Sequence, residues 1–98
     1  MMTNKKTLNL DSMVICSDGV VASDLDGEVV MMSVERGEYY GLDDIASRIW
    51  HLIEIPRSIR EICEILSPEY DVERELIEQD VLTFFQDIYE DKLIRIVE

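Results

Sequence analysis

Hydrophobic and polar residues follow a strand-like pattern in the first half of the chain. Asp24–Gly27 supplies the aspartate and glycine that a tight hairpin turn favours, and apolar segments flank it at Val20–Ser23 and Glu28–Val34. A second turn at Glu35–Gly37 leads into Glu38–Leu42, which is aromatic and strand-like. The pattern predicts a three-stranded antiparallel sheet.

One predicted strand is expected at the centre of the sheet, and two further segments have strand character. Val29–Met32 does not alternate, so we expect this strand to be central and covered on much of both faces. Met13–Cys16 is expected to add an edge strand. Leu93–Val97 is expected to form a short terminal strand or an extended tail.

The second half of the chain predicts three helices, of which the first precedes Pro56. Asp43 or Asp44 can cap this helix, and Pro56 ends it. Its apolar stripe comprises Ile45, Ala46, Ile49, Trp50, Leu52 and Ile53.

The second helix begins with a capping box, in which the Ser58 hydroxyl accepts from a first-turn amide and Glu61 reaches back. Ser67–Pro68 is expected to break this helix, and Asp71 to cap a third helix that runs to about Glu90. The apolar positions of the second helix are Ile59, Ile62, Cys63 and Leu66, and those of the third are Ile77, Val81, Phe84, Phe85 and Ile88.

These elements predict an α+β protein with a winged helix-turn-helix-like arrangement, in which a three-stranded antiparallel sheet is followed by three helices. We expect a single domain at residues 13–98 after an N-terminal tail at residues 1–12. The longest apolar runs are four residues, whereas a membrane helix needs about 20. With no signal-peptide pattern and only two cysteines, the chain is expected to be a reduced, cytoplasmic protein without a membrane partner.

Charge narrows the choice of partner. The chain has a net charge of −13, of which residues 38–98 contribute −10. Residues 69–91 hold nine acids and one base, Arg74, so the third helix is unsuited to DNA. The acids keep the protein soluble, and they can also steer a basic partner segment.

The sequence contains no set of residues typical of a catalytic site. His51 is the only histidine, and Cys16 and Cys63 do not form a C-x-x-C motif. Acids at helical spacing on the third helix are interpreted as a solvated face rather than as paired carboxylates. The sequence therefore favours a binding module with no cofactor and no metal.

Tyr39–Leu42 is the most unusual segment for such a module. If this strand forms the sheet edge, its unpaired backbone groups can accept an extended peptide as an added strand. The alternative is that the aromatic rings are ordinary packing residues. Alternation places one ring on each face, so the core needs at most one of them.

The segments Val29–Met32, Gly37–Asp43 and Ala46–Ile53 resemble PqqD-like proteins, most closely the stand-alone leader-recognition proteins of lasso-peptide pathways. Ile77–Phe85 is similar to the third helix of that family, and the resemblance covers roughly residues 12–97. The chain departs from the family at Ile55–Arg57, which replaces a glycine-bearing turn.

The resemblance implies a RiPP recognition element, a non-catalytic adaptor that captures the leader of a ribosomally made precursor peptide. The leader would add to the third strand, in a groove beside the third helix, for delivery to a cysteine leader peptidase; the cyclase is a further candidate partner. The implied peptide-binding residues are Glu38, Tyr39, Tyr40, Gly41 and Leu42 on the strand, and Leu76, Asp80, Val81, Phe84 and Phe85 on the helix.

Phe84 and Phe85 point about 100° apart on a helix, so one is expected in the core and the other in the groove. Two alternatives stay open. One is a PqqD-like chaperone of another modified peptide, such as the precursor of the quinone cofactor, and the other is a winged-helix transcriptional regulator.

Overall fold

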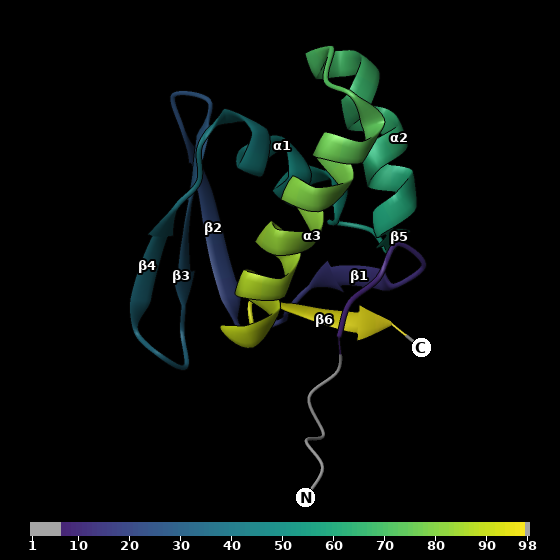
Figure 1. The fold of residues 1–98 in the computed structure, drawn as a ribbon. Coiled ribbons are helices and arrows are strands. Elements are labelled where there is room, and N and C mark those ends of the chain that lie inside the picture. Colours follow the sequence, from purple (N-terminus) through teal and green to yellow (C-terminus); the bar gives the residue numbers. More distant parts are fainter. Residues whose placement is uncertain (1–6, 98) are drawn as a thin grey trace, which may run out of the picture.

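Two small antiparallel sheets and three helices make up the computed structural model, which describes residues 7–97 (Figure 1). The strands are β1 (Met13–Cys16), β2 (Val20–Leu25), β3 (Glu28–Ser33), β4 (Glu38–Gly41), β5 (Arg57–Ser58) and β6 (Ile94–Val97). The helices are α1 (Asp44–Leu52), α2 (Ile59–Tyr70) and α3 (Arg74–Glu90).

The predicted three-stranded sheet is confirmed as β2–β3–β4. Asp26 and Gly27 adopt φ values of 54° and 87°, the left-handed conformation that the tight β2–β3 turn requires. β3 is central, as predicted. The face of β3 that carries Val29 and Met31 is buried, whereas Val30 and Met32 on the other face are only half-buried. One face of the sheet therefore belongs to the core and the other is partly open.

The sequence does not predict the second sheet. β1 lies between β5 and β6 and pairs antiparallel with both. The prediction that Met13–Cys16 is an edge strand is therefore wrong, because two short partners from distant parts of the chain pair on either side of it. The terminal strand expected at Leu93–Val97 is confirmed by β6.

The starts of α1 and α2 follow the predicted capping. The Asp43 carboxylate accepts a hydrogen bond from the Ala46 amide at 2.9 Å, and the Ser58 hydroxyl accepts one from the Glu61 amide at 3.1 Å. The Glu61 carboxylate accepts a bond from Arg57 at 2.8 Å instead of reaching back as a capping box predicts. α1 ends at Leu52, before Pro56 as expected.

The predicted boundary between α2 and α3 is wrong. Pro68 lies inside the last turn of α2, where its missing N–H removes a single helical bond, and the helix continues to Tyr70. Asp71 ends α2 in the left-handed conformation, at φ 54° and ψ 47°, and does not cap α3. Ser67 stabilises this end, because its backbone carbonyl accepts from the Val72 amide and its hydroxyl donates to the Val72 carbonyl. α3 starts at Arg74 and reaches Glu90 as predicted.

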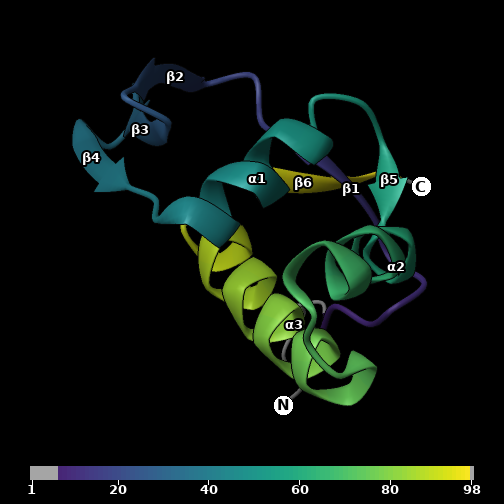
Figure 2. The same ribbon diagram turned by 90° about the horizontal axis from the view of Figure 1, so that it is seen from above.

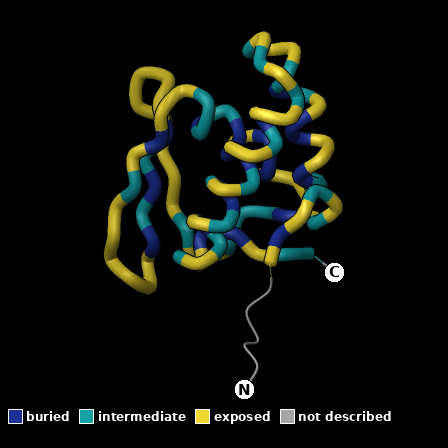
Figure 3. Tube along the Cα trace, viewed as in Figure 1, coloured by how far each residue is buried: buried dark blue, intermediate teal, exposed yellow. Residues whose placement is uncertain are grey.

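The core includes residues of the three helices and of β1, β3 and β6, and Figure 3 shows buried segments on both the helices and the strands. The apolar stripes predicted for α2 and α3 are buried, except that Phe84 is only half-buried. β2–β3–β4 stands to one side of the helices and is joined to α1 by the short segment after β4 (Figure 2). The α+β class is confirmed, although the second sheet makes the arrangement only loosely winged-helix-like.

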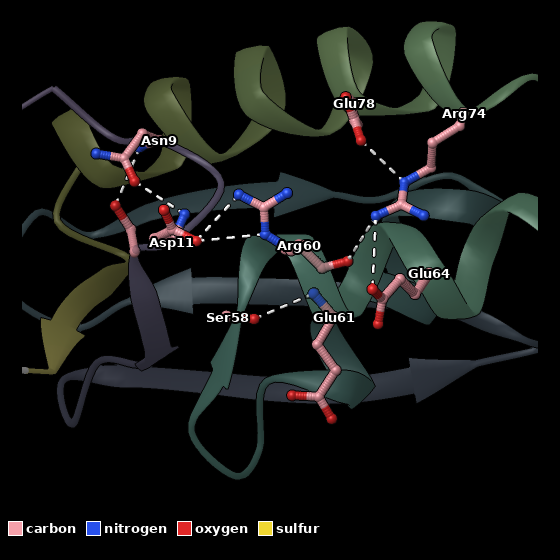
Figure 4. A network of polar contacts seen from close by, with 9 residues as sticks. Asn9, Asp11, Ser58, Arg60, Glu61, Glu64, Arg74 and Glu78 are labelled. Carbon is pink, nitrogen blue, oxygen red and sulfur yellow. Dashed lines mark hydrogen bonds and ion pairs between the residues drawn. The ribbon is translucent and has the colours of Figure 1, made fainter.

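Residues before β1 pack on the helices. Leu8 is buried, and its amide donates to the Gln86 side chain at 3.2 Å. Arg60 of α2 forms an ion pair with Asp11 at 3.0 Å (Figure 4). Arg74 of α3 pairs with Glu78 of the same helix at 2.9 Å and with Glu64 of α2 at 3.8 Å. The boundary of a tail at residues 1–12 stays a prediction, and its first six residues lie outside the described ones. No described helix is long and apolar enough to cross a membrane.

Candidate functional site

β4 presents an open edge among the described strands, because it pairs with β3 on one side only. The Leu42 amide donates to the Val29 carbonyl at 2.9 Å, which fixes the direction of the alternating backbone groups. Tyr40 therefore turns its N–H and C=O toward β3, whereas Tyr39 and Gly41 turn theirs away from the sheet. These outward groups can form hydrogen bonds with an added strand.

The turn before β4 is tied to the end of α3. The Tyr40 hydroxyl donates to the Glu38 carboxylate at 2.8 Å, and this bond is the first cause of the raised pKa of Tyr40. Arg36 donates to the same Glu38 oxygen at 3.1 Å, and its other nitrogen lies 3.7 Å from Asp91. This chain of exposed contacts connects β4 to the residue that follows α3.

An apolar pocket of about 220 Å³ opens between α1 and α3. Ile45, Ala46 and Ile49 form its α1 wall. Ile77, Val81 and Phe84 form its α3 wall. Because β4 runs directly into α1 through Leu42 and Asp43, this pocket lies close to the end of the open strand edge.

Two carboxylates stand at the rim of this pocket. Asp43 lines it and is held by its capping bond to the Ala46 amide. Asp80 also lines it, is exposed, and has no hydrogen-bond or ion-pair partner in the described part of the chain. The pocket is therefore an apolar hollow with a free negative charge beside it.

Ser47 holds the strand edge and the pocket together. Its side chain is buried, donates a hydrogen bond to the Leu42 carbonyl at 3.2 Å, and accepts one from the Val29 amide at 2.9 Å. One hydroxyl thus connects α1 to β3 and to the end of β4. Sequence reasoning missed this residue, although a polar side chain four residues after the Asp43 cap, within the apolar stripe, is an available signal.

The residues implied by the resemblance separate into three groups. Asp80, Val81 and Phe84 line the pocket, and Glu38, Tyr39, Tyr40 and Gly41 form the strand beside it. Leu42 and Phe85 are buried, so they support the site from the core. Leu76 is 53 % exposed and is not part of the pocket lining. Of the two phenylalanines, Phe84 therefore lines the pocket and Phe85 lies in the core.

The α1 wall of the pocket was not among the predicted site residues. Ile45, Ala46 and Ile49 were interpreted as core positions. The available signal was the width of the apolar stripe of α1, which is greater than one packing face requires.

The histidine and the two cysteines lie outside the pocket. His51 contacts Asp24 at 3.1 Å and Glu54 at 3.3 Å. Burial lowers the pKa of His51, but the hydrogen bonds to Glu54 and Asp24 have the larger effect. The pKa of His51 is therefore raised above its ordinary value. Burial raises the pKa of both Cys16 and Cys63 to about 11. Within residues 7–97, no group of three histidine, cysteine or acidic side chains is placed to hold a metal ion.

Fold and site together define a small α+β domain with an open sheet edge beside an apolar pocket. The family model of PqqD, coenzyme PQQ synthesis protein D, matches residues 28–94. The chain belongs to the PqqD family.

Two solved structures are similar to the chain. TbiB1 in complex with the TbiA(beta) leader peptide is 36 % identical, with a TM-score of 0.78, over 83 % of this chain and 94 % of that one. The PqqD truncation of Methylobacterium extorquens PqqCD, a stand-alone RiPP recognition element, is 20 % identical, with a TM-score of 0.75, over 90 % of this chain and 94 % of that one; at this identity the likeness concerns the fold. No curated protein matches the chain.

Proposed function

We propose that this chain is a RiPP recognition element, which binds the leader of a ribosomally made precursor peptide and presents it to a cysteine leader peptidase. The observation that carries the proposal is the open edge of β4 next to the 220 Å³ apolar pocket. The leader complex of TbiB1, a relative at 36 % identity, supports it. In this role the chain is a non-catalytic cytoplasmic adaptor.

The leader binds by adding a strand to β4. Its backbone pairs with the outward N–H and C=O groups of Tyr39 and Gly41, which supply affinity with little demand on sequence. Alternate leader side chains then point toward the helices. One of them enters the pocket against Val81 and Phe84.

The pocket is suited to a side chain rather than to a free small molecule. Its volume of about 220 Å³ lies below the roughly 300–1,000 Å³ of typical small-molecule sites. Its lining is mainly aliphatic, so it selects an apolar leader residue. Asp80 at the rim favours a lysine or arginine next to that residue.

The test of strand addition is a fluorescence-anisotropy titration with synthetic leader peptides from candidate precursors, followed by amide exchange at saturation. Exchange should slow at the Tyr39 and Gly41 amides, which face outward. The Tyr40 and Leu42 amides face β3 already and serve as internal controls. Saturable binding that leaves the exchange at Tyr39 and Gly41 unchanged would reject strand addition.

The role of Asp80 is tested with a charge-neutralising variant. Asp80→Asn should weaken leader binding by more than tenfold if the contact is desolvated, because removing one partner of a buried interfacial pair costs about 2–5 kcal/mol and about 1.4 kcal/mol is one decade. The matched control is Glu73→Gln, an exposed carboxylate at the start of the same helix. Equal weakening by both variants would mean that the acids act only as a diffuse field.

A second candidate is a chaperone for the precursor of another modified peptide, and the family match to a protein of coenzyme PQQ synthesis favours it. The same titration separates the two, because each reading predicts a different leader as the tight binder. A transcriptional regulator is disfavoured by α3, since residues 69–91 carry nine acids and one base.

A further inference from the structure

A hollow of about 640 Å³ lies where α3 ends and β6 begins. Its polar lining comprises the cations of Lys92 and Arg95, the carboxylate of Glu90, and the hydroxyls of Ser17 and Tyr89. Two cations against one carboxylate make this part of the surface locally positive, although the net charge of the chain is −13.

The side chains of Lys92 and Arg95 differ from the other basic side chains that the structure describes. Every arginine from Arg36 to Arg74 forms an ion pair with a carboxylate. Within residues 7–97, neither Lys92 nor Arg95 has a carboxylate partner or a side-chain hydrogen bond. Two free cations in one hollow would attract a carboxylate that is added from outside.

The backbone at Lys92 supports a role for its side chain. Lys92 adopts φ 63°, in the left-handed region where glycine fits best. Its amide donates to the Tyr89 carbonyl at 3.0 Å, and the Leu93 amide donates to the Ile88 carbonyl at 2.9 Å. These two bonds form a Schellman motif, which usually has a glycine at this position. The helix end therefore gains nothing from a lysine backbone, and strained residues of this kind gather at functional sites.

The hollow lies near the start of β4, whereas the apolar pocket lies near its end. The turn before β4 contains Arg36, whose guanidinium lies 3.7 Å from the Asp91 carboxylate, and Asp91 directly precedes Lys92. In Figure 1 the last turn of α3 and the start of β4 lie at the same end of the molecule. A leader strand that leaves β4 at this end would reach the hollow with its next residues.

A tethered peptide suits this hollow better than a free anion does. The chain as a whole repels anions, because its net charge is −13. A leader that is already paired with β4 holds its next residues at an effective concentration on the order of millimolar. Even a weak ion pair then contributes to leader affinity.

We infer that this hollow binds an acidic side chain of the leader through ion pairs with Lys92 and Arg95. The inference rests on the proposed function and adds a charge pattern to the leader, with a basic residue beside Asp80 and an acidic residue toward the other end. The axis of α3 extends about 18 Å from Asp80 to Lys92, and an extended chain covers this distance in about five or six residues. The two charged leader residues should be separated accordingly.

The test is a fluorescence-anisotropy titration of the full chain, at low salt, with the synthetic leader of the precursor from the same pathway. The charge variant is Lys92→Gly with Arg95→Gln. It should weaken leader binding about three- to tenfold, since an exposed ion pair is worth up to about 1 kcal/mol and about 1.4 kcal/mol is one decade. The control is Arg48→Gln with Arg60→Gln, which changes the net charge equally on α1 and α2 and should leave leader affinity unchanged.

Leader variants identify the partner carboxylate. Each aspartate or glutamate of the leader is replaced in turn by asparagine or glutamine. One replacement should weaken binding to the wild type and have no further effect on the charge variant, which is the sign of a direct contact. Urea unfolding is measured in parallel, and Lys92→Gly should not lower the unfolding midpoint, because glycine suits the left-handed position.

The alternative is that Lys92 only complements the negative end of the α3 dipole. In that case Lys92→Gly lowers the unfolding midpoint while leader affinity stays unchanged, and the inference is overturned. Equal weakening by the charge variant and its control also overturns it, as does a leader in which no acidic residue affects binding. A wild-type chain that does not bind the leader at all would instead refute the proposed function.

Discussion

Strand addition can be tested at a single backbone amide, that of Gly41. This residue ends β4, and its N–H points away from the sheet because the next amide, that of Leu42, is bonded to Val29. A Cβ added at Gly41 meets no atom within 4 Å, and its φ lies outside the left-handed region. Gly41→Pro therefore deletes the outward donor, while Gly41→Ala adds a side chain and keeps the donor.

The expected loss of leader affinity in Gly41→Pro arises because one leader carbonyl is left without a hydrogen-bond donor. A buried unsatisfied group costs about 1–3 kcal/mol, which is roughly 5- to 150-fold in the dissociation constant at about 1.4 kcal/mol per decade. Both substitutions should change the free energy of unfolding by no more than about 1 kcal/mol, since they fit the extended backbone. No internal sheet bond is lost in either variant.

The assay compares the two variants by leader anisotropy and by urea unfolding. Gly41→Pro should bind more weakly than Gly41→Ala by the factor given above, at equal stability. If the two variants bind equally well while both are folded, the leader does not pair with this edge, and the strand-addition mode is refuted.

Three further predictions concern the two phenylalanines of α3, the buried Ser47 and the exposed His51. Phe85→Ala should destabilise the fold by about 3–5 kcal/mol in urea unfolding, whereas Phe84→Ala should mainly weaken leader binding. Ser47→Ala should cost about 1–3 kcal/mol and loosen leader binding, because it leaves a buried amide unpaired. His51 stabilises the fold when charged, and its raised pKa means that this stability is present below about pH 6.5 and is lost as the pH rises through the folded-state pKa. His51→Gln should remove that pH dependence from the free energy of unfolding. The change should be less than about 1 kcal/mol, because the ion pair is exposed.

The parts of the fold that could be predicted from sequence depend on neighbours in the chain. The β2–β3 turn needs residues that tolerate positive φ, and Asp26 and Gly27 supply them. The Asp43 cap and the Ser58 cap each bond an amide three residues ahead. In each case the contact lies within one turn, so the residue pattern carries the information.

The predictions that are wrong concern segments whose structure depends on distant residues or on competing local contacts. Met13–Cys16 is a central strand because β5 and β6 arrive from residues far along the chain. Pro68 suggested a break, yet a proline in the last turn costs a single helical bond, and the αL conformation of Asp71 ends the helix instead. A sequence window cannot weigh such alternatives, since each is compatible with the local pattern.

The candidate site shows the same division. The residues of β4 and α3 could be named because a resemblance placed them on one strand and one helix face. The α1 wall could not, because Ile45, Ala46 and Ile49 have the same apolar character as core residues. Only the packing of α1 against α3 shows that Ile45 and Ala46, which are half-buried, and Ile49, which is a core residue, also border a hollow.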